Sequence, residues 1–196
     1  MPELHGRKAI VLASQSPQRA ELLRAAGIAF EVAAPRFEEP DIEATHVSPW
    51  KLAESLSYFK ARSVADAYPD RIVLGADTVV AVGQRVFGKP VDADDARRIL
   101  AALLGTTQEV ITGVTLYRAA DERRLIRHAV TRVTMRAMIP DELDAYIACG
   151  DWAGKAGAYG LQGEADRFVT RLEGSRSNVV GLPVELVRQM LAEFEG

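Results

Sequence analysis

One carboxylate interrupts an apolar run near the middle of this 196-residue chain. Asp77 lies in the segment IVLGADTVVAV, which spans residues 72–82. The β-branched apolar residues predict a strand buried on both faces, where a carboxylate is costly unless it is paired, hydrogen-bonded or bound to a metal. Gly75 indicates that another group approaches the backbone closely, and Lys89 follows in a tight turn. The pattern is typical of a phosphate or metal site, but a structural ion pair or a turn-capping Asp is equally compatible with it.

A serine-rich turn precedes the first predicted helix. The apolar run at residues 9–13 predicts a buried strand, and Ser14 and Ser16 follow it. Ser16 is a good N-cap, with Pro17 at the first helical position. Arg19 stands in the first turn, where its charge opposes the helix dipole and needs another explanation. Free N–H groups, two hydroxyls and an arginine therefore favour an anion-binding site over simple helix capping.

Two further charged features have two interpretations each. Glu38 and Glu39 lie in an acidic loop and could bind a hard cation, although a solvated charge cluster is the commoner explanation. Lys60 falls on the apolar face of a helix predicted from residue 49 to residue 67. It either points into a site or extends along the apolar surface to reach water, and the second outcome is the more frequent one.

The segment GQRVFGKP at residues 83–90 nearly matches the phosphate-binding P-loop pattern G-x-x-x-x-G-K-[ST]. Its last position is Pro90, which has neither a hydroxyl for Mg²⁺ nor an N–H for phosphate. The next helix also begins later, with Asp92 as its predicted N-cap. We therefore reject a P-loop kinase or ATPase.

A glycine-rich segment, WAGKAGAYGLQG, occupies residues 152–163 and is too short for a collagen-like repeat. It is typical of a loop whose backbone passes close to a ligand. Lys155 and Gln162 are the polar side chains that such a loop would offer to the ligand.

The remaining patterns predict strands and helices within one domain that covers residues 1–196. Strands are expected at residues 9–13, 28–33, 72–82, 109–117, 125–138 and 168–172. Helices are expected at residues 17–26, 49–67, 93–104, 141–149 and 184–194. The strands at 109–117 and 125–138 predict an antiparallel hairpin.

The composition is that of an ordinary soluble globular protein, with 48% apolar and 26% charged residues. A net charge of −3 gives no bulk attraction to nucleic acid or to an anionic membrane. The single Cys149 excludes an internal disulfide and fits a reducing cytosol, and the three isolated histidines predict no zinc site. We expect a cytoplasmic protein without a signal peptide or a membrane-spanning segment.

Together these features supply cations, acids near turns and hydroxyls at a helix start, beside a glycine-rich loop. The cations are Arg19, Lys60 and Lys89, and the acids are Glu38 and Asp77. This combination suits a nucleoside triphosphate bound with a divalent metal. Nothing in the sequence argues for covalent catalysis, so water is the expected nucleophile.

Eight segments resemble motifs of the Maf family, and they occur in order over nearly the whole chain. They are LASQSPQRAELL (12–23), FEEP (37–40), KARSVA (60–65), GADTVV (75–80), GKP (88–90), TGV (112–114), AGAYGLQG (156–163) and VVGLPV (179–184). Members of this family are nucleoside triphosphate pyrophosphatases with an inosine-triphosphatase-like fold. The resemblance implies an α/β fold in which helices flank a mixed, twisted sheet and a cleft separates two lobes.

The resemblance also implies a reaction and the residues that perform it. Water, with the help of Mg²⁺ or Mn²⁺, hydrolyses the bond between the α- and β-phosphates. The products are a nucleoside monophosphate and pyrophosphate. Asp77 would accept a proton and would bind the metal together with Glu38. The residues that would contact the triphosphate are Ser14, Ser16, Arg19, Lys60 and Lys89.

Three positions bear on base preference within the family. Thr78 and Gln162 resemble the group that hydrolyses dTTP and UTP, whereas the 7-methyl-GTP group has GSDQ where this chain has GADT. The dTTP/UTP group has S-P-R-R where this chain has S-P-Q-R, so Gln18 replaces an arginine associated with substrate choice. The alternatives are a pyrophosphatase of the 7-methyl-GTP type and a nucleotide-binding regulator of cell division without turnover.

A nucleoside triphosphate is therefore the expected partner. A nucleic-acid partner is not expected, because the sequence has no basic stripe with interleaved aromatic residues. A homodimer is compatible with the sequence, although no feature of it establishes one.

Overall fold

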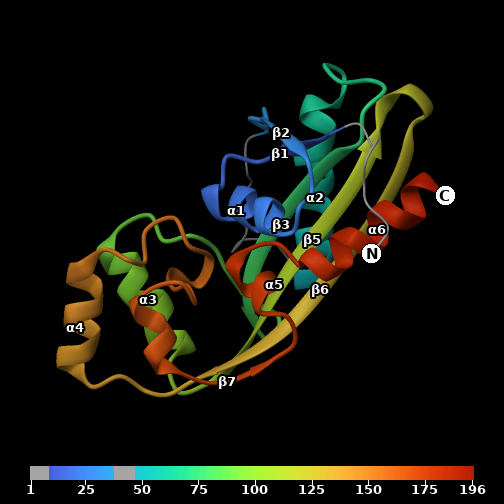
Figure 1. Ribbon diagram of the computed structural model, residues 1–196. Coiled ribbons are helices and arrows are strands. Elements are labelled where there is room, and N and C mark those ends of the chain that lie inside the picture. Colours follow the sequence, from blue (N-terminus) through green and yellow to red (C-terminus); the bar gives the residue numbers. More distant parts are fainter. Residues whose placement is uncertain (1–8, 38–46) are drawn as a thin grey trace.

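The computed structural model describes residues 9–37 and 47–196, which form an α/β fold around one mixed sheet (Figure 1). Its strands are β1 (Ile10–Ala13), β2 (Phe30–Ala33), β3 (Val73–Val82), β4 (Arg85–Phe87), β5 (Thr107–Arg118), β6 (Arg123–Met135) and β7 (Val169–Glu173). Its α-helices are α1 (Pro17–Ala25), α2 (Pro49–Ala65), α3 (Ala93–Leu103), α4 (Pro140–Cys149), α5 (Arg176–Val180) and α6 (Val184–Glu195). Short 3₁₀ helices lie at η1 (Ala119–Asp121), η2 (Ala156–Ala158) and η3 (Glu164–Phe168). The predicted fold class is confirmed.

The strand order leaves part of one edge of β3 without a partner. The order is β2-β1-β3-β5-β6-β7, with β1 parallel to its two neighbours and the β3-β5-β6-β7 pairs antiparallel. The β1–β3 pairing ends at Ala13 and Gly75, and β4 pairs with the same edge of β3 only from Val80 onwards. No described strand pairs with this edge at residues 76–79, which leaves it open to other groups.

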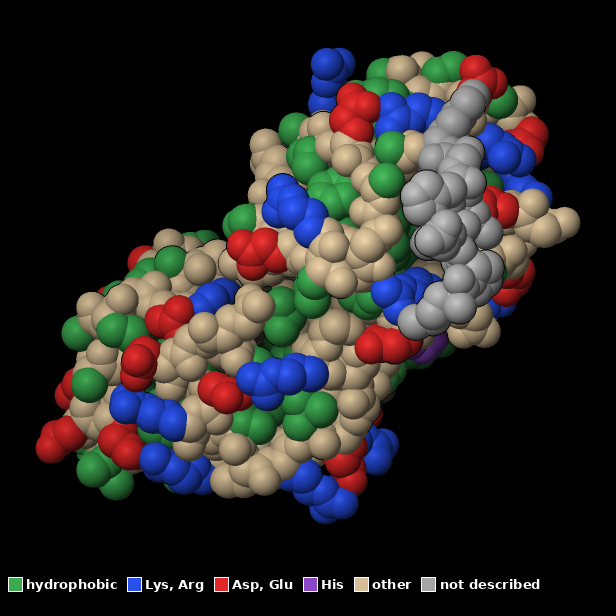
Figure 2. All heavy atoms as spheres, in the orientation of Figure 1, with side chains coloured by type: hydrophobic (Ala, Val, Ile, Leu, Met, Phe, Trp, Pro, Cys, Tyr) green, Lys and Arg blue, Asp and Glu red, His purple; other side chains and the backbone are tan. Residues whose placement is uncertain are grey.

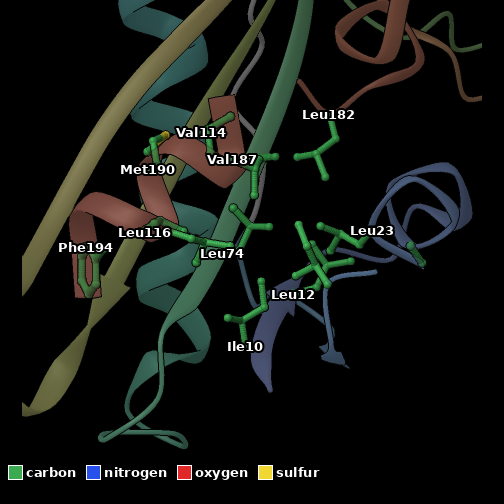
Figure 3. Packing of buried hydrophobic residues seen from close by; sticks show 14 residues of the cluster. Ile10, Leu12, Leu23, Leu74, Val114, Leu116, Leu182, Val187, Met190 and Phe194 are labelled. Atoms are coloured by element: carbon green, nitrogen blue, oxygen red, sulfur yellow. The ribbon is translucent and has the colours of Figure 1, made fainter. Parts of the chain in front are cut away.

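Helices cover both faces of the sheet in the lobe that contains β1 and β2. On one face, Leu12 and Leu74 pack with Leu23 of α1 and with Val187 of α6, as Figure 3 shows. On the other face, α2 packs against the sheet, for example through Ala61. Alternate residues of β1 and β3 therefore contact different helices, as expected for strands buried on both faces.

A second apolar cluster forms the other lobe, into which β3, β5 and β6 extend (Figure 1). It contains Phe87 of β4, Leu100 of α3, Tyr146 of α4 and Phe168 of η3. The Phe168 and Tyr146 rings meet edge to face, with 6.4 Å between their centroids. The predicted division into two lobes follows from these separate clusters on shared strands.

The backbone of α2 lies very close to the sheet because two strand positions lack side chains. A Cβ atom at Gly75 would overlap the carbonyl oxygen of Ser57, and one at Gly113 would overlap that of Ala53. Gly113 pairs with Asp77 across β3 and β5, and Gly75 lies two residues before Asp77 on the same face. The close approach predicted at Gly75 is confirmed, and the approaching group is a helix.

The sequence patterns missed two short elements. β4 lies within residues 83–90, which we compared only with a P-loop, and α5 lies in a segment for which we predicted no helix or strand. Predicted helix and strand ends elsewhere differ from the observed ends by a few residues; β6, for example, ends at Met135 instead of at residue 138. Within the described ranges, no helix has both the length and the apolar character needed to span a membrane.

Candidate functional site

A cavity of about 790 Å³ lies beside the open edge of β3. Both lobes contribute to its wall, through the turn before α1, β3, the segment after α4 and the end of α5. The predicted site residues that line it are Ser14, Ser16, Gln18, Arg19, Lys60, Asp77, Thr78, Lys89 and Gln162. Its volume is in the range of cavities that bind small molecules. Glu38 and Glu39 lie outside the described residues, so their predicted place in the site cannot be compared.

Asp77 and Lys60 form an ion pair in the wall of this cavity. Each residue is 6% exposed, and the Nζ atom of Lys60 donates a hydrogen bond to Oδ1 of Asp77. Of the two outcomes considered for Lys60, the structure therefore shows the less frequent one, in which the side chain points into the site. The glycines that bring α2 against β3 place this side chain beside Asp77, where each charge compensates the other.

Arg19 contacts three parts of the chain that are far apart in sequence. Its Nε atom donates to the carbonyl oxygen of Gly181 at 2.8 Å, and Nη2 donates to Oγ1 of Thr78 at 3.1 Å. A longer contact of 3.3 Å joins Nη1 to Oγ of Ser14. These three acceptors are uncharged, and together they orient the guanidinium group.

The N-terminus of α1 has the predicted capping geometry. The Oγ atom of Ser16 accepts a hydrogen bond from the backbone N–H of Arg19 at 3.4 Å. The same hydroxyl donates to Oε1 of Gln18 at 3.0 Å, and Oγ of Ser14 accepts from the backbone N–H of Ser16 at 3.1 Å. The N-cap is confirmed, while the anion-binding role of this turn stays a prediction.

Thr78 lies on the opposite face of β3 from Asp77 and connects the strand to α5. Its hydroxyl lies 2.9 Å from that of Thr112, which in turn donates to the carbonyl oxygen of Asn178 at 3.3 Å. The side chain of Asn178 donates to the carbonyl oxygen of Val110 on β5 at 3.0 Å. Sequence reasoning singled out Thr78 but missed Thr112 and Asn178; Asn178 directly precedes the motif VVGLPV.

The glycine-rich loop lines the cavity, and two of its glycines lie against side chains of the protein itself. A Cβ atom at Gly160 would lie 3.0 Å from Cδ of Lys155, and one at Gly163 would overlap the carboxylate of Asp151. Lys155 and Asp151 form an ion pair with each other. These glycines therefore leave room for two side chains of the protein itself, and the predicted approach of the loop backbone to a ligand stays a prediction.

Tyr159 belongs to the same loop and is 4% exposed. Burial raises the pKa of this phenol to about 12, and its hydroxyl accepts a hydrogen bond from Nε2 of Gln108 at 3.3 Å. The phenol therefore stays neutral at physiological pH and does not supply a phenolate for chemistry.

The described carboxylates fit a metal that is also bound by the substrate. Across residues 9–37 and 47–196, no three His, Cys, Asp or Glu side chains converge as a metal site of their own. Asp77 and Asp151 are the cavity-lining carboxylates in these ranges, and Asp77 is the buried one. Because Mg²⁺ is commonly bound by one or two carboxylates together with phosphate oxygens and water, Asp77 fits this mode. The metal role of Glu38 stays a prediction.

Comparison with known proteins gives consistent similarities over nearly the whole chain. The family model described as Maf-like protein matches residues 9–194. A "dTTP/UTP pyrophosphatase" of Symbiobacterium thermophilum is 43% identical over 94% of this chain and 93% of its own length. Proteins with the same name from Moorella thermoacetica and Xanthomonas euvesicatoria pv. vesicatoria are 44% and 42% identical, over 94% of this chain and 94% and 98% of their own lengths.

Proposed function

The chain belongs to the family of Maf-like proteins, and we propose that it hydrolyses dTTP and UTP to nucleoside monophosphates and pyrophosphate. The family expectation from the eight sequence motifs is thereby confirmed. Relatives named for this pyrophosphatase activity cover nearly the full length of the chain, which supports assigning it to the same class of hydrolase.

The observation that carries this proposal is the position of Asp77. A carboxylate that is 6% exposed, paired with Lys60 and facing a cavity between two lobes has a clear use in hydrolysis. A protein that only binds nucleotides needs cations for the phosphates but has no need for this acid. We therefore prefer turnover to the alternative of a non-hydrolysing regulator.

In the proposed reaction, Asp77 orients a water molecule for in-line attack and accepts its proton. Arg19 and Lys89 bind phosphate oxygens in the cavity that both residues line, and Lys60 compensates the charge of Asp77. Lys89 is exposed and has no ion pair within the described chain, so its charge is available to the substrate.

A divalent metal is part of the proposal, with Asp77 and Glu38 as the residues that would hold it. When bound, such a metal supplies positive charge that stabilises the developing negative charge on the phosphates. Support comes from charge compensation: Lys60 and Lys155 are already paired with acids, so the side-chain cations cannot neutralise a triphosphate alone.

Base selection is proposed to depend on Gln18, Thr78 and Gln162, all of which line the cavity. Thr78 and Gln162 support a preference for pyrimidine triphosphates, by their resemblance to the dTTP/UTP group. Gln18 offers an amide where that group has arginine, so we expect weaker discrimination against other bases.

A small anionic substrate agrees better with the surface than a nucleic acid does. Figure 2 shows acidic and basic side chains interspersed over this face, without a basic stripe. A cytoplasmic location is also part of the proposal and is supported by the single Cys149. A homodimer stays a prediction.

The test is pyrophosphate release from a panel of canonical and modified nucleoside triphosphates with Mg²⁺ or Mn²⁺. We expect release from dTTP and UTP, with the matching monophosphate as the second product. Nucleotide binding without pyrophosphate release by the purified protein would contradict the proposal and favour a regulator. Preferential release from 7-methyl-GTP would instead favour the other substrate group.

A further inference from the structure

The ion pair between Asp151 and Lys155 lies at the start of the loop that carries Gln162. We propose that this pair positions Gln162 for base selection, an inference that rests on the proposed pyrophosphatase function. In this role Asp151 and Lys155 are positioning residues, which act on the substrate base through Gln162.

Asp151 connects both ends of the loop through one carboxylate. Its Oδ1 atom accepts a hydrogen bond from Nζ of Lys155, and its Oδ2 atom accepts one from the backbone N–H of Glu164 at 3.0 Å. Lys155 precedes Gln162 and Glu164 follows it, so the two contacts flank the selecting residue. Movement of either end therefore requires breaking a charge-assisted hydrogen bond.

The loop also packs directly against the pair. Gly160 lies over the aliphatic part of Lys155, and Gly163 lies against the carboxylate of Asp151, each with too little space for a Cβ atom without a shift. Gln162 stands between these two glycines. The side chains of Lys155 and Asp151 therefore restrict the backbone on either side of Gln162, at Gly160 and at Gly163.

A further hydrogen bond holds the loop from the α5 side. Nη2 of Arg176 donates to the carbonyl oxygen of Leu161 at 2.9 Å, and the Leu161 side chain is 3% exposed. Gln162, the next residue, is exposed and lines the cavity. A buried anchor next to an exposed amide is the arrangement expected when a polar side chain must be presented at a fixed place.

Fixed placement matters because an amide can discriminate bases only through hydrogen bonds of correct distance and direction. A neutral hydrogen bond changes binding by about fivefold, and misplacement of the amide forfeits that contribution. Breaking the ion pair between Asp151 and Lys155 should therefore reduce base selectivity. The residues proposed for the chemical step, such as Asp77, are left unaltered.

The experiment compares kcat and KM for dTTP and GTP in the full-length enzyme and its variants. Asp151→Asn and Lys155→Met break the pair from either side, and Gln162→Ala removes the selecting amide. Asp144→Asn is the matched control, since it breaks an ion pair between Asp144 on α4 and Arg97 on α3 in the same lobe, and neither residue lines the cavity. Thermal unfolding of each variant checks that it is folded at the assay temperature.

We expect each pair-breaking variant to lower the dTTP/GTP ratio of kcat/KM by about fivefold or more, mainly through a higher KM for dTTP. Asp144→Asn should leave the ratio unchanged. In the double variant Asp151→Asn/Gln162→Ala, the ratio should equal that of Gln162→Ala alone, because Asp151 has nothing left to position.

Three results would overturn the inference while leaving the proposed function intact. These are an unchanged ratio in both pair-breaking variants, additive losses in the double variant, and a parent enzyme that hydrolyses dTTP and GTP equally well. A parent enzyme that releases no pyrophosphate from any nucleoside triphosphate would instead overturn the proposed function and the inference with it.

Discussion

Lys60 and Asp77 form a buried ion pair that belongs both to the core and to the wall of the cavity. Lys60 comes from α2 and Asp77 from β3, and glycines on β3 and β5 let the two elements approach closely enough for the contact. The two interpretations of Asp77, as a structural ion pair and as a site residue, are therefore compatible with each other.

The first prediction concerns the chemistry of Asp77. Replacing Asp77 by Asn removes the proposed proton acceptor and one proposed metal ligand, so kcat should fall by about 100-fold or more. The measurement is steady-state pyrophosphate release from dTTP, below the unfolding temperature of the variant. Near-normal turnover would exclude Asp77 as the proton acceptor.

The second prediction separates stability from activity in the same pair. Lys60→Met or Asp77→Leu alone leaves one buried charge without its partner and should lower the free energy of unfolding by about 3–5 kcal/mol. The double variant Lys60→Met/Asp77→Leu should recover most of this loss, since replacing both charges by apolar groups is often neutral. Urea denaturation monitored by circular dichroism measures the free energy.

The double variant should nevertheless be inactive. A double variant as unstable as the sum of the single variants would mean that the pair is not coupled in the folded protein. A double variant that still hydrolyses dTTP would place the chemistry elsewhere in the cavity.

The third prediction is metal dependence. A triphosphate carries roughly four negative charges, and an enzyme of this kind usually neutralises them in part with a divalent cation. Treatment with EDTA followed by gel filtration should abolish pyrophosphate release, and Mg²⁺ or Mn²⁺ should restore it. Full activity of the metal-free protein would refute the proposed cofactor.

The fourth prediction concerns Gln18, whose amide accepts a hydrogen bond from Ser16 and lines the cavity. Gln18→Arg introduces the arginine that the dTTP/UTP-hydrolysing members of the family have at this position. It should raise selectivity for pyrimidine triphosphates about fivefold to tenfold. The values to compare are kcat/KM for dTTP, UTP, CTP and GTP. Gln15→Arg is the control, because it adds the same charge elsewhere on the cavity wall.

Equal rankings and ratios in the parent and Gln18→Arg would show that residue 18 only supports the helix N-terminus. Equal effects of the two arginine variants would indicate general electrostatic attraction instead of base selection.

The fifth prediction concerns acid stability away from the cavity. Side-chain hydrogen bonds from Arg136 hold the pKa of Glu142 well below its ordinary value of 4.5, at about 2. Because the folded-state pKa is the lower one, the stabilisation is complete above pH 4.5 and disappears as the pH falls towards 2. Glu142→Gln should therefore lower the unfolding temperature at pH 6 but not at about pH 2. A constant difference between the two proteins across this range would contradict the assignment.

Local chemistry predicted much of the fold. The apolar run around Asp77, the N-cap at Ser16 and the N-cap at Asp92 all depend on residues close in sequence, and all are present in the structure. The same holds for the long β5–β6 hairpin, whose apolar and polar residues alternate over many positions.

The features that local sequence patterns left open or missed depend on residues far apart in the chain. The orientation of Lys60 depends on Gly75 and Gly113, which lie on different strands and together admit the α2 backbone. The five-residue helix α5 is too short to have a helical periodicity, and its Asn178 is held by acceptors on β5 and β6. Neither arrangement leaves a local pattern that can be recognised before the sheet is assembled.

The hydrogen bond from Arg19 to Gly181 joins residues that are 162 positions apart. Closing so long a loop has a high entropic cost, and contacts of large sequence separation slow folding. Asp77 can meet Lys60 through a contact between residues only 17 positions apart, whereas the contact between Arg19 and Gly181 forms only when the C-terminal segment has docked. An incomplete or partly unfolded chain would therefore hold the proposed proton acceptor without one of the three contacts that orient Arg19, so the proposed hydrolysis should require the finished fold.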